Sequence, residues 1–467
     1  MLRFFSAILA TCYSVSLMAA GPLVLEGPDG HVPVTYLNPN IELNIETGSL
    51  GLMTNDIADQ MVRDAIAIWN NVSWNNVSTS TINLTQGLDV PVDIDGSNFS
   101  SYLDNDSDRL NPVVYDDDGS IIDAFFGDGA KDSVVGFAAS SYLVNSSHFI
   151  EGFVVITGHL RVPPGMLKLI VAHEIGHYFG LDHTQANIDN TETLDDLCPT
   201  PEADYPLMYP YACRESDRLH PDDVVSISML YPESDYFERQ GQLTGRLVTP
   251  EGFSVRGANV WLENTSTGDV YSVVSDYLRQ GTGFFALMLP PGSYTLHANS
   301  INSEFYGGSS VGPYAWTPTD FSFLPPASTI GSVVFAADGP PPAIVTLAAG
   351  ESVNVEFRTD GSGSINASDT QVDLIPDTLT SDDGGGGSPS LPLLATLLGI
   401  PALRIITKLS APGGKRGLTR MAIDPPTRVT SSGKRREYVR VGSTAASLPP
   451  TFPTEATRVG LSECHSG

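Results

Sequence analysis

Basic residues are scarce in this sequence, with 24 Lys and Arg against 54 Asp and Glu and a formal net charge of −30 over 467 residues. Phosphate backbones and anionic lipid surfaces repel such a chain, so we expect no nucleic acid partner. The balance reverses near the end, because residues 404–467 hold 11 Lys and Arg and 4 Asp and Glu. The length allows two or three domains.

Long apolar runs are also missing. A helix that spans a bilayer needs about 20 apolar residues, and the candidate stretches at the N-terminus and at 391–403 are shorter. Residues 1–20 combine a basic residue, an apolar run and small final residues, the pattern of a signal peptide cleaved near Ala20. We therefore expect an exported protein, secreted or held at the cell surface.

Cysteine is rare as well, and only Cys198, Cys213 and Cys464 would remain after that cleavage. Export permits disulfides. A Cys198–Cys213 bridge would close a loop of about 15 residues and stabilise the fold by roughly 3 kcal/mol. The alternative is a pair of free buried thiols.

The residues that indicate metal binding and catalysis lie in one segment, His173-Glu174-Ile175-Gly176-His177-Tyr178-Phe179-Gly180-Leu181-Asp182-His183. The apolar residues before it, which follow two prolines, predict a helix. Residues four apart share a helix face, so His173 and His177 can bind one metal ion. Gly180 permits a left-handed turn that returns His183 as a third ligand. Glu174 then remains available to accept a proton.

This H-E-x-x-H-x-x-G-x-x-H pattern is the signature of the metzincin metallopeptidases. The run Leu207-Met208-Tyr209-Pro210-Tyr211 and the pair Asp222-Asp223 make residues 30–232 resemble the matrixin branch. By that resemblance Met208 lies in the turn beneath the metal, and Pro210 and Tyr211 border the pocket for the residue after the scissile bond. The implied fold is α+β, a twisted mixed sheet with long helices. Its edge strand, near Phe153–Ile156, would pair with an extended peptide. Another metzincin branch is the alternative.

The resemblance implies an exported zinc-dependent endopeptidase that hydrolyses peptide bonds of proteins. Zn²⁺ on His173, His177 and His183 would activate a water, with Glu174 as general base. Substrates would be proteins or peptides, and we expect a monomer. The alternative is a non-catalytic, zinc-stabilised surface adhesion protein. Glu174 favours the enzyme, since metal binding alone needs the histidines but not the base.

Two acidic clusters allow further predictions. Asp116, Asp118 and Asp123 surround a glycine turn and offer hard oxygen ligands, which predicts a Ca²⁺ site. The alternative is a solvated acidic loop. Asp222 and Asp223 open a predicted helix, where negative charge complements the helix dipole.

The pattern changes after residue 240. Short alternating strands with Gly and Pro turns over 240–358 predict an all-β sandwich. The run Leu289-Pro290-Pro291-Gly292-Ser293-Tyr294 makes this region resemble the carboxypeptidase-regulatory-like (transthyretin-like) domain. Residues 359–390, rich in Gly, Ser and Asp, predict a linker.

The C-terminal region, from residue 384 onward, consists of three parts. The glycines of 384–387 and the apolar segment 391–408 with its basic end resemble the GlyGly-type sorting signal of Gram-negative bacteria. That resemblance implies transient membrane anchoring and cleavage near 384–388. Residues 409–467 predict a basic, disordered tail that contributes nothing to the mature enzyme. The tail is either an extension or the product of a shifted reading frame.

Overall fold

The computed structural model describes residues 21–26, 32–103, 109–143, 146–186, 205–214, 216–278, 280–301, 330–337, 339–368, 428–429 and 438–447. The predicted signal peptide, Cys198 and the predicted sorting segment lie outside these residues. Across the described ranges, no helix is long and apolar enough to cross a membrane.

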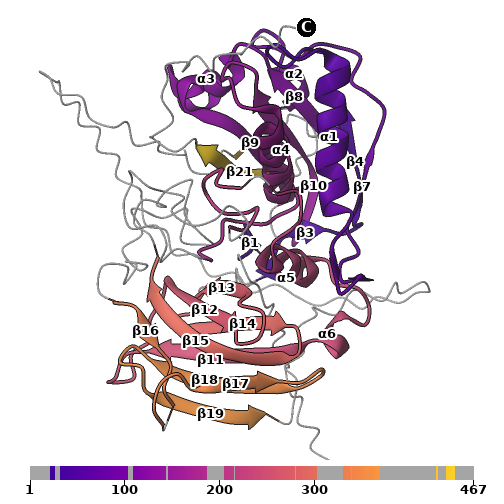
Figure 1. Ribbon diagram of the computed structural model, residues 1–467. Coiled ribbons are helices and arrows are strands. Elements are labelled where there is room, and N and C mark those ends of the chain that lie inside the picture. Colours follow the sequence, from indigo (N-terminus) through magenta and orange to yellow (C-terminus); the bar gives the residue numbers. More distant parts are fainter. Residues whose placement is uncertain are drawn as a thin grey trace, which may run out of the picture.

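A mixed sheet with helices packed against it forms the first part of the molecule (Figure 1). Its strand order is β20-β21-β9-β10-β8-β4-β7, with β3 beside β10. Strands β4, β7, β8 and β10 are parallel, whereas β9 runs antiparallel to β10 and β21 runs antiparallel to β9. The strands are β3 (Thr35–Tyr36), β4 (Asn40–Ile45), β7 (Asn83–Gln86), β8 (Pro112–Asp116), β9 (Val134–Leu143), β10 (His148–Thr157), β20 (Arg428–Val429) and β21 (Tyr438–Ser447).

Two long helices, α1 (Asn55–Trp69) and α4 (Pro164–Tyr178), lie side by side in this part (Figure 1). Most apolar residues of α1 recur at helical spacing and are buried. The Trp69 indole donates a hydrogen bond of 2.7 Å to the carbonyl of Ala172 in α4. The shorter elements are β1 (Leu25–Glu26), β2 (Val32–Pro33), β5 (Ser73–Trp74), β6 (Val77–Ser78), α2 (Ser100–Leu103), α3 (Ser120–Phe126), the 3₁₀ turn Ala130–Asp132, α5 (Pro221–Leu230) and α6 (Tyr236–Arg239).

The predicted edge strand proves to be central. Phe153–Ile156 belongs to β10, which has β8 on one side and β9 on the other. Its near-continuous apolar run is typical of an interior strand, because both faces of such a strand are covered. The prediction of an edge at Phe153–Ile156 was therefore wrong. The outer position falls to β9 and β21.

The second part consists of two sheets, ordered β14-β11-β18-β19 and β13-β12-β15-β16, with β17 also paired to β15. Buried side chains of both sheets share one core, for example Leu243 and Val355 with Val260 and Leu296. The strands are β11 (Gly241–Val248), β12 (Ala258–Asn264), β13 (Val270–Val274), β14 (Phe284–Leu289), β15 (Gly292–Ser300), β16 (Val333–Val334), β17 (Ile344–Leu347), β18 (Ser352–Arg358) and β19 (Gly363–Ser368).

Two C-terminal predictions need correction. The start of the predicted linker is the hairpin strand β19, and the Asp360 carboxylate accepts bonds from Ser362 in the turn before it. Its Gly, Ser and Asp residues therefore make a turn, which has the same composition as a linker. The predicted disordered tail supplies β20 and β21 to the first sheet, so the prediction was wrong for these residues.

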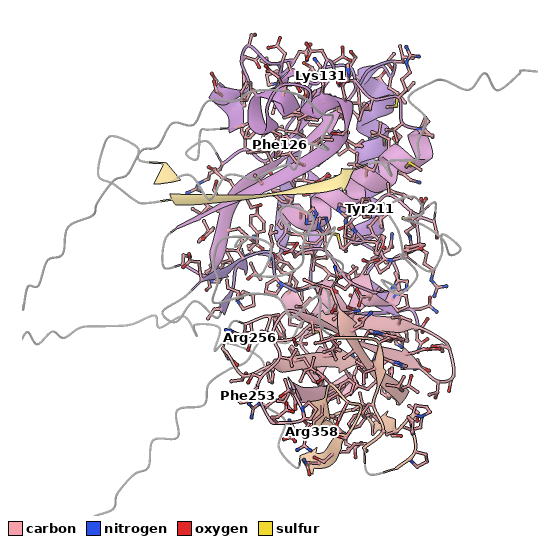
Figure 2. All side chains as sticks on the ribbon, turned by 90° about the vertical axis from the view of Figure 1, so that its left-hand side faces the viewer. Phe126, Lys131, Tyr211, Phe253, Arg256 and Arg358 are labelled. Atoms are coloured by element: carbon pink, nitrogen blue, oxygen red, sulfur yellow. The ribbon has the colours of Figure 1, made fainter. Side chains whose placement is uncertain are left out.

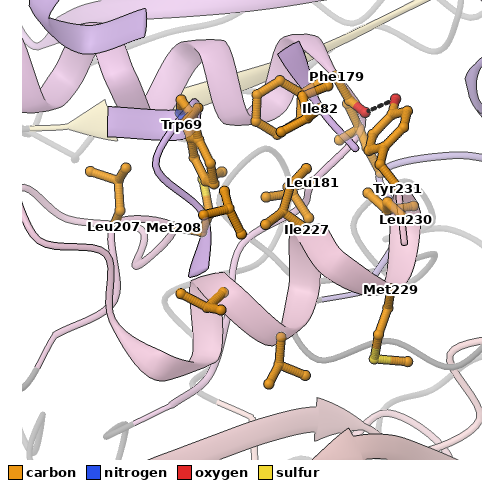
Figure 3. Close-up of a cluster of buried hydrophobic side chains, with 14 of the residues drawn as sticks. Trp69, Ile82, Phe179, Leu181, Leu207, Met208, Ile227, Met229, Leu230 and Tyr231 are labelled. Atoms are coloured by element: carbon orange, nitrogen blue, oxygen red, sulfur yellow. Dashed lines mark hydrogen bonds between the residues drawn. The ribbon is translucent and has the colours of Figure 1, made fainter. Parts of the chain in front are cut away.

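Helix α5 joins the two parts. Its Ile227, Leu230 and Tyr231 lie in one apolar cluster with Trp69 and Met208, and the Tyr231 hydroxyl donates to the carbonyl of Phe179 at 2.7 Å (Figure 3). At the other end of α5, the Asp222 carboxylate accepts from the Ser272 amide of β13 at 2.8 Å. The β-sheet part is thus fixed to the helix that supports the candidate site.

Candidate metal centre

Helix α4 and the turn after it bring the three histidines of the motif together. Pro164 occupies the first helical turn, where its missing N–H costs nothing. The helix ends at Tyr178, and Gly180, two residues later, has a φ of +104°. A Cβ there would lie 2.9 Å from the Phe149 ring and 3.1 Å from the Val34 carbonyl. Glycine is needed for both the backbone angle and the space, and the turn directs His183 back toward the helix.

The metal-facing nitrogens of the histidines converge. His183 Nε2 lies 3.3 Å from His173 Nε2 and 3.1 Å from His177 Nε2. Tetrahedral zinc with Zn–N bonds of about 2.0–2.1 Å places neighbouring nitrogens about 3.3 Å apart. Among the residues that the structure describes, these three histidines are the group of His, Cys, Asp or Glu side chains that can hold a metal ion.

The opposite ring nitrogens fix the protonation of two of these histidines. His173 Nδ1 lies 2.5 Å from the carbonyl of Leu207, and His177 Nδ1 lies 2.7 Å from the carbonyl of Leu181. Each Nδ1 must donate to its carbonyl, which leaves an unprotonated Nε2 pointing to the centre. Burial lowers the pKa of His173 to about 4 and the pKa of His177 well below its usual value. Converging lone pairs on neutral rings fit a cation.

Glu174 lies beside this centre with an unused carboxylate. The side chain is fully buried, and neither oxygen has a hydrogen-bond partner within the described part of the chain. Burial raises the pKa of this carboxyl well above its usual value, and a bound cation would oppose that shift. A Cβ on Gly136 of β9 would lie 3.1 Å from Glu174 Oε1, so the strand passes directly by the carboxylate.

The turn around Met208 packs against the helix that carries His173 and His177. A Cβ on Gly176 would lie 2.3 Å from Met208 Sδ, so the methionine packs against the bare helix backbone between His173 and His177. The sequence motif leaves Gly176 without a role, although a glycine inside a helix usually has such a packing reason. The Met208 carbonyl also accepts from the Thr184 amide at 3.0 Å, next to His183.

Asp223 holds that turn, a role that the sequence did not indicate. Its carboxylate accepts from the amides of Leu207 at 2.7 Å, Met208 at 3.0 Å and His220 at 3.0 Å. The bond from His220 completes the capping box of α5. The helix-dipole interpretation of Asp223 was therefore incomplete, because this carboxylate also fixes the carbonyl that orients His173.

Pro210 is buried, and Tyr211, labelled in Figure 2, packs against the cluster of Tyr205, Tyr209 and Cys213. Their predicted place at the substrate pocket stays a prediction.

The predicted Ca²⁺ site is not supported. Asp116 accepts from the amides of Ile121 and Ile122, Asp118 from Ser120, and Asp123 from Gly129 and Lys131. Within the ranges that the structure describes, the three aspartates form no group able to hold a metal ion. Their oxygens instead satisfy the start of α3 and the turn that follows it, which is the usual work of Asp in such turns.

The comparisons with known proteins agree with this geometry in part. Residues 73–184 match the family described as Metallo-peptidase family M12B Reprolysin-like. The matched range contains the three histidines and Glu174 and ends before Met208. The curated proteins compared with this chain give no match. The chain thus contains a reprolysin-like metallopeptidase domain with a three-histidine metal site, which supports the metzincin prediction but not its matrixin branch.

The buried Asp222 carboxyl predicts how the stability of the fold depends on pH. Burial raises its pKa to about 7, whereas an unfolded Asp titrates at about 3.9. The folded state therefore favours the protonated form, and this contribution to stability, complete below about pH 4, is lost as the pH rises through about 7. Asp222→Asn stays neutral and keeps an oxygen for the Ser272 amide. We expect urea unfolding to show Asp222→Asn gaining about 2–4 kcal/mol over the parent between about pH 5 and pH 8. A difference that does not change with pH would contradict this assignment.

Proposed function

We infer that this chain is an exported zinc-dependent endopeptidase that cleaves peptide bonds of proteins. The observation that supports it most is the combination of three converging Nε2 atoms with an adjacent, unpartnered Glu174 carboxylate. A site that only stabilised the fold would have a fourth protein ligand and no need for this carboxylate. Export rests on residues 1–20, and a Gram-negative cell surface on the resemblance of 384–408 to a sorting signal.

The chemistry follows from the positions of these side chains. Zinc bound at the three Nε2 atoms would polarise the scissile carbonyl and lower the pKa of water. Glu174 then accepts the proton of the attacking water and passes it to the leaving amine. Leu207 and Leu181 hold the rings of His173 and His177 in place through their carbonyls. Met208 supports the helix from below, and Pro210 and Tyr211 border the substrate.

The choice of metzincin branch is a separate matter. The run Leu207-Met208-Tyr209-Pro210 resembles the matrixins, while the matched family is reprolysin-like. The proposed chemistry is common to both branches, because it needs only the histidines and Glu174. The two sheets over 241–368 are proposed as a carboxypeptidase-regulatory-like β-sandwich that serves as a spacer or adhesive module.

The decisive test is cleavage of a diverse peptide library by the zinc-loaded full chain, with cut sites read by mass spectrometry. We expect cuts that stop on exhaustive chelation and return with added zinc. A chain that binds one zinc but cuts no peptide would favour the alternative, a non-catalytic, zinc-stabilised adhesion protein. Activity that survives chelation would contradict a zinc mechanism.

The disulfide near the Met208 turn gives a further prediction. Cys213 is disulfide-bonded and buried, and we propose Cys198 as its partner. The bridge would close the loop from Cys198 to Cys213, which contains Met208, and stabilise the fold by roughly 3 kcal/mol. Peptide mapping without reduction should yield one linked peptide with both cysteines. Native alkylation of both thiols would contradict the pairing, and alkylation of Cys198 alone would show that Cys213 pairs elsewhere.

A further inference from the structure

A segment from the far end of the chain covers the outer strand of the peptidase sheet. β9 would otherwise be the last strand, because its inner side pairs with β10. β21 pairs antiparallel with the outer side of β9, from Tyr438 opposite Leu143 to Ser447 opposite Val134. Figure 2 shows β21 running across the peptidase part, and α4 also contacts it.

The register places the C-terminal half of β21 at the level of the candidate catalytic carboxylate. Ala445 lies opposite Gly136, and Gly136 is the residue whose Cβ would meet Glu174 Oε1 at 3.1 Å. Thr444 and Ser443 lie opposite Phe137 and Ala138. The strand therefore runs past Glu174 as an extended main chain, rather than covering a remote part of the sheet.

Backbone pairing at this edge is exclusive. An extended peptide that binds a sheet edge uses the outward N–H and C=O groups of the last strand. β21 already uses those groups of β9 over almost the whole length of that strand. A substrate cannot pair there while β21 does.

We propose that residues 438–447 are an autoinhibitory strand that occupies the peptide-binding edge of β9 and must leave before a substrate can bind. This inference rests on the proposed peptidase function, and it identifies the substrate as an extended main chain that pairs with β9. It also reverses the sequence-based prediction that the tail contributes nothing to the enzyme.

Charge favours a reversible contact. Residues 404–467 carry a net charge of +7, whereas the whole chain is at −30. A basic tail is attracted to an acidic body, and salt screens that attraction over about 10 Å at 0.1 M. Tethering adds an effective concentration of about millimolar. Higher ionic strength should therefore release the strand in part.

The test uses full-length chains. Ser443→Pro with Thr444→Pro disrupts β21, since adjacent residues of a strand point their N–H groups to opposite sides and one of the two must face β9. The matched control places two prolines beyond β21, at Thr454 and Glu455. We expect the β21 variant to raise kcat/KM on library peptides by roughly tenfold or more over both the parent and the control. Added salt should raise the activity of the parent but not of the β21 variant.

A binding measurement separates this inference from the proposed function. A fluorescent peptide of residues 436–449 should bind the β21 variant, compete with substrate and bind the parent at least tenfold more weakly. Equal cleavage by the β21 variant and the control, or equal peptide binding, would overturn the autoinhibitory strand and leave the peptidase intact. If no chain cuts any peptide although zinc is bound, the peptidase function fails, and the peptide binding still decides whether β21 occupies the edge.

Discussion

Replacing Glu174 by alanine should abolish peptide cleavage and leave zinc bound at one ion per chain. The three ligand nitrogens belong to His173, His177 and His183, so the metal site survives. The proton acceptor does not, and a positioned general base contributes about 10²- to 10⁴-fold in rate. Metal analysis of the purified protein and kcat/KM on a peptide found by the library screen measure the two effects separately.

Two further variants serve as controls for Glu174. Glu174→Gln keeps the shape of the side chain but cannot accept the proton, so it should be as inactive as the alanine variant. His177→Ala should lose zinc and activity together, because it removes a ligand. The β21 proline background keeps the assay sensitive if the tail inhibits the parent. Full turnover by Glu174→Ala in that background would contradict its role as the base.

Replacing Asp223 by alanine should have the largest effect on stability. The change leaves the buried amides of Leu207, Met208 and His220 without their acceptor. Each such amide costs about 1–3 kcal/mol, so for the three we expect a loss of roughly 3–9 kcal/mol. Without these bonds the turn would move and shift the Leu207 carbonyl that orients His173. Zinc affinity should therefore fall by roughly 10- to 100-fold. Urea unfolding and competition with a chelator measure the two effects.

Glu46 provides a matched control for Asp223. It is another buried carboxylate, and it accepts from the backbone amides of Ile94 and Tyr115, which belong to neither the turn nor the histidines. Glu46→Ala should therefore destabilise the fold while the folded protein keeps its zinc affinity. If folded Asp223→Ala bound zinc as tightly as the parent, the proposed link from Asp223 through Leu207 to His173 would be wrong.

The edge strand shows where sequence patterns fail. The apolar run Phe153–Ile156 correctly predicts a strand, because local composition reports burial. Whether that strand is the edge or the interior depends on which segments pair beside it. β9 and β21 decide this, and strand pairing over long distances leaves no local mark in either partner. The same limit hid the role of Asp223, because the Leu207 and Met208 amides that donate to its carboxylate lie in another segment of the chain.

The sequence by itself determined the metal-binding helix, its glycine turn and the three ligands, because the spacing of His173, His177, Gly180 and His183 acts within one short segment and follows from helix geometry. It also located the change to short strands after residue 240, since strands show in the local periodicity. Only the tertiary structure decided which strand forms the edge and that residues 438–447 cover it. It likewise showed that the carboxylates of Asp116, Asp118 and Asp123 accept from backbone amides and do not form a shared Ca²⁺ site. These outcomes depend on contacts between distant segments. The free energy of such contacts comes from burial and strand pairing, which depend on both segments and cannot be predicted from either one alone.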